Sequence, residues 1–221
     1  TARMHIKGEV YYQHLFDVPV ESGKGSSFSL LNVFDGVVYK KLENSGLGRN
    51  YGAEITLEQF LNRGFYFLLS SSWYRSEYRG SDKIWRDSRF NGEVLNTLTA
   101  GKEWKWDRKG KDRAIGINLK VTQTGGYRTT PIDLEASRMK GDIVYVESQA
   151  FSQQLPDYFR ADVGVRLRRN YRHTTTTFSL DVQNATNRQN VFDQFYDPVK
   201  QEVRYFYQAP LIPILAYKIE F

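Results

Sequence analysis

Hydrophobic and polar residues alternate with a period of two along most of this chain, and helical periodicity is almost absent. The clearest run extends from Phe159 to Arg168. One side of it carries Phe159, Ala161, Val163, Val165 and Leu167, and the other carries Arg160, Asp162, Gly164, Arg166 and Arg168. Because successive side chains of a strand point to opposite faces, this run predicts a strand with one apolar face. The charged face requires water or a polar interior.

The same alternation predicts eight strands along the chain. They cover about residues 3–15, 49–61, 65–75, 90–106, 113–123, 158–171, 174–184 and 208–221. The fold class expected from this pattern is all-β, with antiparallel strands of a transmembrane β-barrel. An even strand number is what a bacterial barrel with both termini on one side requires.

The connections between these segments alternate between short and long. Short links occur at Asn62-Arg63-Gly64, at Asp107 to Asp112 and at Arg172-His173, whereas residues 16–48, 76–89, 124–157 and 185–207 form long links. Outer-membrane barrels have short periplasmic turns and long extracellular loops, and a soluble Greek-key sandwich has no reason for this alternation. The first strand is therefore expected to start in the periplasm and the last strand to end there.

The final segment, from Leu211 to Phe221, places Leu215, Tyr217, Ile219 and Phe221 on one face. It resembles the terminal strand of outer-membrane barrels, in which a C-terminal aromatic residue follows alternating apolar residues. The resemblance implies that Tyr217, Ile219 and Phe221 form the assembly signal that the barrel-assembly machinery reads.

Three further stretches resemble the C-terminal half of TonB-dependent receptors of the Bacteroidetes type. They are GRNYGAEITLE at 48–58, TAGKEW at 99–104 and FSLDVQNATNRQNVF at 178–192. The last stretch has an Asn-x-x-Asn turn shortly before the final strand. The resemblance implies a 22-stranded barrel in the bacterial outer membrane, filled by a plug domain and energised by TonB, with a surface lipoprotein as a further partner.

Residues 1–221 are then expected to be the C-terminal barrel segment of such a receptor. Eight strands cannot enclose a pore that needs 22, and this sequence contains neither the plug nor the TonB-binding segment. The chain is expected to be a fragment, a proteolytic remnant or one piece of a split receptor. The remaining strands, the plug domain and TonB itself would be its partners.

Charged residues on the polar faces are expected to point into the barrel lumen. The residues assigned to this set are Glu54, Glu58, Arg160, Asp162, Arg166 and Asp181. Their carboxylates invite comparison with a glycosidase pair, but each alternates with apolar neighbours in a strand that has basic residues nearby. Paired or hydrated charges inside a barrel are the favoured interpretation.

Aromatic residues make up 15% of the chain, which suits strands that place rings at a membrane interface. Ordinary cross-strand packing is the alternative, because aromatic pairs favour any sheet. Their position near segment ends favours an aromatic girdle, assigned to Tyr51, Trp73, Trp104, Trp106, Tyr158 and Phe159. The short turns are also basic, with Arg63, Arg108, Lys109, Lys111, Arg172 and His173, and the sequence offers no physical reason for this.

Other functional classes find little support. The net charge of +6 is interleaved with acids rather than clustered, so nucleic-acid binding is not expected. No phosphate-binding loop is present, and the absence of Cys excludes thiolate chemistry. His5, His14 and His173 lack metal-ligand spacing. No catalytic, cofactor or metal site is therefore expected.

The leading hypothesis is a segment of a nutrient-uptake receptor that contributes strands to the barrel and loops for substrate recognition. A self-contained eight-stranded barrel with an adhesion or anchoring role is the first alternative, since eight strands can close around their own side chains. An outer-membrane enzyme such as a lipid hydrolase is the second. It would need a nucleophile next to a base, and the histidine spacings do not suggest one.

Overall fold

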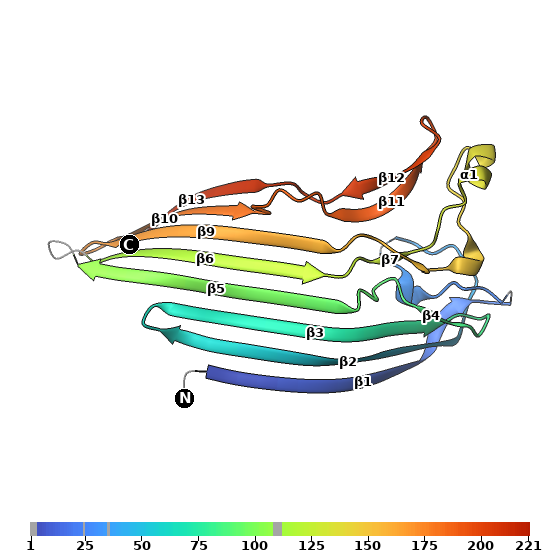
Figure 1. Cartoon of the computed structure of the whole chain (residues 1–221), viewed down its shortest axis with the longest axis horizontal. Coiled ribbons are helices and arrows are strands. Elements are labelled where there is room, and N and C mark those ends of the chain that lie inside the picture. Colours follow the sequence, from blue (N-terminus) through green and yellow to red (C-terminus); the bar gives the residue numbers. More distant parts are fainter. Residues whose placement is uncertain (1–3, 24, 35, 108–111) are drawn as a thin grey trace.

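The structure is a computed structural model that describes residues 4–23, 25–34, 36–107 and 112–221. Eight strands form the main sheet: β1 (Met4–Glu21), β2 (Leu42–Asn62), β3 (Phe65–Arg79), β5 (Val94–Asp107), β6 (Asp112–Thr124), β9 (Tyr158–Asn170), β10 (Thr175–Gln183) and β13 (Ile212–Glu220). They lie side by side in that order, and every neighbouring pair is antiparallel (Figure 1). The expectation of an all-β, antiparallel fold is confirmed.

The short connections gather at one end of this sheet and the long ones at the other (Figure 1). We call these the turn end and the loop end. The turn between β2 and β3 places Arg63 at φ 50° and Gly64 at φ 78°, as in a type I′ hairpin turn, which matches the twist of the flanking strands. Residues 108–111 of the predicted Asp107–Asp112 turn lie outside the described residues. The β9–β10 turn closes with a hydrogen bond of 2.7 Å from Tyr171 N to Thr174 O.

The first two strands are longer than their alternation predicts. β1 continues to Glu21 and β2 begins at Leu42, whereas the pattern ended at residue 15 and began at residue 49. The extension contains register shifts around Val18, and Asp17 adopts φ 53°. A β-bulge shifts side chains from one face to the other, which breaks the alternation, and Pro19 is tolerated beside such an irregularity.

The long connections contain structure that the sequence pattern did not predict. β4 (Trp85–Asp87) pairs with β3, β7 (Arg128–Thr129) pairs with β8 (Gln153–Gln154), and β11 (Val191–Asp197) forms a hairpin with β12 (Glu202–Tyr207). The only α-helix of the described chain is α1 (Leu134–Lys140), and single 3-10 turns occur at Leu30–Asn32 and Glu147–Gln149. The Asp133 carboxylate caps α1 by accepting from Ala136 N.

The main sheet is open. β1 and β13 are the two ends of the strand order, and no pairing joins them among the described residues, so no closed barrel is detected. Each of these strands therefore presents one row of backbone N–H and C=O groups that none of the described strands pairs, apart from an isolated bridge between Val20 of β1 and Ser29. Such edges are templates for pairing with further strands.

Buried apolar side chains are few and lie almost entirely at the loop end. In the described part of the chain they are Val18, Val20, Tyr78, Ala114, Ala150, Leu155 and Tyr196. Only Ala114 belongs to the turn-end half of the sheet. The loop end thus has a core of its own, whereas the sheet buries almost no large side chain.

Candidate functional site

The strand register brings one set of apolar residues from each of the eight strands onto the same face of the sheet. Directly paired residues share a face, and Val163 is paired with Leu119 on β6 and with Val182 on β10. The same face continues outward to both edges of the sheet. We call it the apolar face, and its central members are Ile6, Val10, Ala53, Ile55, Leu57, Phe67, Leu69, Leu98, Ala100, Ile117, Leu119, Val121, Val163, Val165, Leu180, Val182, Pro213 and Leu215.

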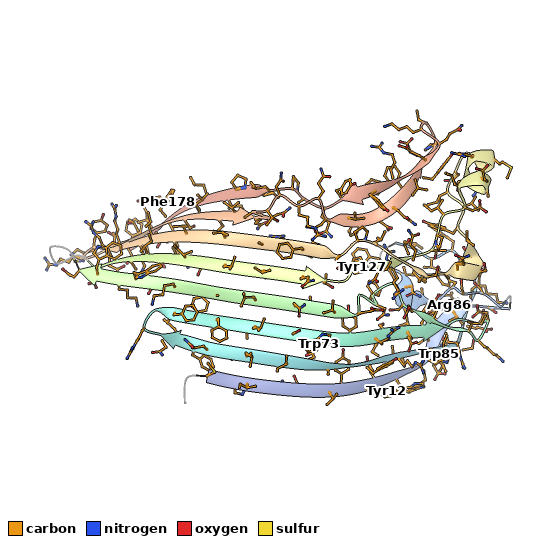
Figure 2. The ribbon with its side chains drawn as sticks, viewed as in Figure 1. Tyr12, Trp73, Trp85, Arg86, Tyr127 and Phe178 are labelled. Carbon is orange, nitrogen blue, oxygen red and sulfur yellow. The ribbon has the colours of Figure 1, made fainter. Side chains whose placement is uncertain are left out.

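Side chains on this face remain accessible although they are large and hydrophobic. Val10 is 86% exposed and Ile6 65% exposed on β1, and Leu215 on β13 is 67% exposed. Figure 2 shows Tyr12, Trp73 and Phe178 on separate strands of this sheet. A continuous apolar surface across eight strands is far larger than the patch that a soluble monomer ordinarily exposes. The face needs an apolar partner.

The opposite face is polar, and it holds every charge that the sequence assigned to the lumen. Arg160 Nε donates to Asp162 Oδ1 at 2.6 Å, and Glu54 Oε1 accepts from Ser72 Oγ at 3.1 Å. Within the described residues Glu58, Arg166 and Asp181 form no ion pair. Among the assigned charges the described residues thus show one ion pair, Arg160 with Asp162, and a hydroxyl group is the partner of Glu54.

Aromatic residues occur at both ends of the apolar face. Trp104 and Trp106 lie at the turn end, and Tyr51, Trp73 and Phe159 lie toward the loop end. The assignment of Tyr158 to the aromatic girdle is corrected by the strand register. Tyr158 points to the opposite face from Phe159 and pairs with Thr124 on the polar face. It is not placed for a girdle around the apolar face.

The loop end is held together by buried polar groups. Asn91 is fully buried; its Oδ1 accepts from Ser76 N at 3.0 Å, and its Nδ2 donates to Asp87 Oδ1 at 2.7 Å. Arg128 reaches the same place, with ion pairs to Asp87 at 3.3 Å and Glu93 at 2.8 Å. Since each buried donor has an acceptor here, the connections after β3 and β6 are fixed against one another.

A cavity of about 710 Å³ lies among the loops at this end. Its lining comes from three connections, the one after β1, the one after β3 and the one that follows β7. Arg86 and Trp85 in Figure 2 mark the β4 side of this region. The lining combines hydroxyls, aromatic rings and charged groups, including Ser26, Phe28, Lys40, Arg86, Tyr145 and Glu147. A volume of this size is typical of small-molecule sites.

Charges in the cavity lining are mostly paired. Lys40 Nζ binds Glu21 Oε2 at 2.9 Å, and Arg86 binds Asp82 at 2.7 Å. Burial raises the pKa of the Tyr145 phenol, and nearby Asp193 raises it further, so this hydroxyl stays protonated and able to donate at neutral pH. Such a lining suits recognition of a polar ligand by hydrogen bonds.

Asn32 in the cavity lining carries an amide N–H group that donates to none of the described residues. Asn32 is 6% exposed, and its Oδ1 accepts from Arg89 N at 2.8 Å. Its Nδ2 has no hydrogen-bond partner among the described residues. An unsatisfied buried donor costs about 1–3 kcal/mol.

The residues predicted to form the assembly signal lie on β13 and directly after it. Tyr217 pairs with Phe178 and Ile219 with Thr176, both on the apolar face, and Phe221 follows the strand and is 99% exposed. The outer edge of β13 is one of the two unpaired edges of the sheet. No group of three or more metal-binding side chains occurs among the described residues.

Three comparisons with known proteins gave no match, whether with family models, curated proteins or solved structures. None of the described helices is long and apolar enough to cross a membrane.

Two features of the site could not be found from the sequence pattern. The cavity is built from connections with no periodicity, so only the folded chain brings Asn32 and Tyr145 together. The buried network around Asn91 joins strand β3 with residues from two connections, the one after β3 and the one after β6. The only sequence signal is a concentration of Ser, Asn and Asp between the strands, which also marks ordinary turns.

Proposed function

We propose that this chain forms part of a transmembrane β-barrel in a bacterial outer membrane, as the C-terminal segment of a TonB-dependent receptor for nutrient uptake. The observation that carries the proposal is the alignment of eight apolar strand faces into one exposed surface, opposite a face that holds charged and hydroxyl groups. A barrel wall has this composition, because one face meets lipid and the other meets the lumen.

The dimensions of the apolar face support this assignment. On β3, Phe65 and Trp73 lie on the apolar face, and Phe67 and Leu69 lie between them. Eight residues span about 26 Å along a strand. A strand tilted by about 40° then spans about 20 Å along the membrane normal, close to the roughly 25 Å apolar band of outer-membrane barrels.

The open edges favour a segment of a larger barrel over a self-contained one. A complete eight-stranded barrel with an adhesion role would need β1 to pair with β13, and these strands stand at opposite ends of the strand order. In the proposed receptor, further strands pair with both edges and enclose the plug domain. The sequence resemblance to TonB-dependent receptors supplies the rest of the proposal, including the partnership with TonB and with a surface lipoprotein.

The loop end would face the cell exterior and recognise the nutrient. Its connections form a self-packed layer with a cavity of about 710 Å³, and this cavity supports the proposal of ligand recognition at the loop end. The turn end would face the periplasm, where the assembly machinery meets Tyr217, Ile219 and Phe221. Pairing of that machinery with the free edge of β13 would be a case of β-augmentation.

Single-cysteine labelling tests the membrane assignment directly, because the chain contains no native Cys. Nitroxide labels at successive positions of β6, from Ile115 to Val121, would be examined in outer membranes for collision with oxygen and with a water-soluble nickel complex. We expect oxygen access to peak at Ile115, Ile117, Leu119 and Val121, and nickel access to peak at the positions between them.

The same measurement can reject the proposal. If the nickel complex reaches labels on both faces equally, the apolar face is not covered by lipid. If labels on both faces are protected from both reagents, a protein layer covers the sheet instead.

A further inference from the structure

The turn end of the apolar face carries a pair of arginines that nothing in the proposed function uses. One row of paired residues crosses five strands there: Trp106, Arg113, Arg169, Thr176 and Ile219. Arg113 and Arg169 are direct cross-strand partners on the same face. Like charges in this position destabilise a sheet, so the pair calls for a counter-charge.

No acidic side chain of the described chain supplies that counter-charge. Neither Arg113 nor Arg169 forms an ion pair, and Arg113 Nε is buried without a hydrogen-bond partner in the described chain. The acids of the turn end all alternate onto the polar face, namely Glu103, Asp107, Asp112 and Glu220. The undescribed residues 108–111 read Arg-Lys-Gly-Lys and add no acid.

The loop end of the same face is different. Arg49 there is paired with Glu77 at 2.7 Å, and Arg75 lies 3.5 Å from Asp87. Basic residues on the apolar face are thus neutralised by the protein at the loop end and are left without acids at the turn end. This asymmetry indicates that the missing anion comes from outside the chain.

The position of the arginine row identifies the kind of anion. The adjacent row, one step toward the sheet centre, contains the aromatic residues Trp104, Phe178 and Tyr217. Rows are about 7 Å apart along a strand, and aromatic residues mark the membrane interface. Arg113 and Arg169 therefore lie at the depth of lipid headgroups, where phosphate is the available anion.

Lys102 provides a further indication. It lies on the apolar face beside Ile117, yet its Nζ reaches back to the turn and donates to Arg63 O at 2.8 Å. A lysine inside an apolar band turns its ammonium group toward the headgroups in this way. The direction of Lys102 agrees with a membrane boundary at the arginine row.

We propose that Arg113 and Arg169 form a binding site for the phosphate of an acidic phospholipid in the leaflet that the short turns face. The guanidinium groups of the two arginines can donate paired hydrogen bonds to phosphate oxygens, while Trp106 covers one side of the headgroup. The inference rests on the proposed membrane location. It also accounts for the basic character of the short turns, since cations near an acidic leaflet are stabilised.

Tryptophan quenching by brominated lipids tests this site. In the background W73F/W85F, only Trp104 and Trp106 report, and both adjoin the arginine row. The chain would be assembled with the remaining strands of its barrel, in which any other tryptophan is replaced by Phe, and folded into vesicles of phosphatidylcholine with 20% phosphatidylglycerol, using 20% brominated lipid of either kind. We expect about a fivefold enrichment of brominated phosphatidylglycerol near these residues at low salt.

Variants show whether the arginines are responsible. R113Q/R169Q should quench equally with both brominated lipids, whereas R113K/R169K should keep most of the preference. The matched control is R166Q/R168Q, which removes two arginines from the polar face of the same region and should retain the preference. Circular dichroism of each variant in the vesicles confirms that the strands form.

The outcomes separate the two proposals. Equal quenching by both lipids in the parent chain overturns the phospholipid site but leaves the membrane location intact. No quenching by either lipid overturns the membrane location itself. A preference that survives R113Q/R169Q, or one that R166Q/R168Q also removes, shows that these two arginines are not the site.

Discussion

Placing an arginine at Leu69 or at Ser70 should separate the two faces of the sheet most sharply. The positions are adjacent on β3, so they lie at the same depth and on opposite faces. Leu69 pairs with Leu57 and Leu98 on the apolar face, whereas Ser70 pairs with Thr56 and Thr97 on the polar face. Leu69 is also midway between Phe65 and Trp73, about 13 Å from each along the strand.

The expected magnitudes follow from these surroundings. Arginine on the lipid face near the bilayer midplane costs about 2–4 kcal/mol, so Leu69→Arg should lower the free energy of unfolding by that amount. At Ser70 the new guanidinium group would lie near Glu54 and Glu58, which flank Thr56 on the polar face. Ser70→Arg should therefore change the stability by less than about 1 kcal/mol.

Reversible unfolding in denaturant, with the chain and the remaining strands of its barrel folded into vesicles, measures both values. Leu69→Gln controls for the loss of the leucine side chain without adding a charge, and it should fall between the parent and Leu69→Arg. Equal and small losses for the two arginine variants would refute the assignment of faces. A larger loss of stability for Ser70→Arg than for Leu69→Arg would mean that the polar face, and not the apolar face, meets the lipid.

Three further predictions concern the loop end, its hairpin and the terminal strand. Asn91→Ala removes the acceptor for Ser76 N and the donor to Asp87, so amide exchange around β4 should accelerate by an amount equivalent to about 2–4 kcal/mol, with exchange in β9 and β10 unchanged. Asp197 accepts from the backbone N–H of Lys200 and Val199 and from Arg204, and these bonds hold its pKa below the usual value. The carboxylate form therefore stabilises the β11–β12 turn above about pH 4, and amide protection there should fall as the pH drops through the lowered pKa, a fall that Asp197→Asn should abolish. Deletion of Phe221 should reduce folded protein in isolated outer membranes while Lys218→Ser does much less; equal accumulation of the Phe221 deletion and the parent would contradict the assembly-signal hypothesis.

The strand pattern predicts the sheet well because one face of each strand is mostly apolar. The alternation from Phe159 to Arg168 assigns Val163 to an apolar face, and the register places Leu119 and Val182 beside it on that face. A shift of one residue would move an entire apolar set to the other face. Alternation therefore carries information about register as well as about strand positions.

Features that depend on neighbours in space were not predictable in this way. Gly164 alternates onto the polar face, and a side chain added there would meet the Asp181 carboxylate, a contact that the sequence pattern does not indicate. Tyr158 was grouped with Phe159 because both stand at the start of a strand, although adjacent residues point to opposite faces. Arg113 and Arg169 are 56 positions apart, and only pairing of β6 with β9 brings them together.

The two ends of the molecule are stabilised by different means. At the loop end, Val20 and Tyr78 are fully buried and Asn91 has its amide satisfied, so this layer gains stability from its own packing and hydrogen bonds. The sheet has no comparable core, and its apolar face gains free energy only when something apolar covers it. A bilayer can cover that face and, through its headgroups, also neutralise Arg113 and Arg169. The loop end needs neither an apolar cover nor a neutralising headgroup. Its fold should therefore depend far less on lipid than the fold of the main sheet.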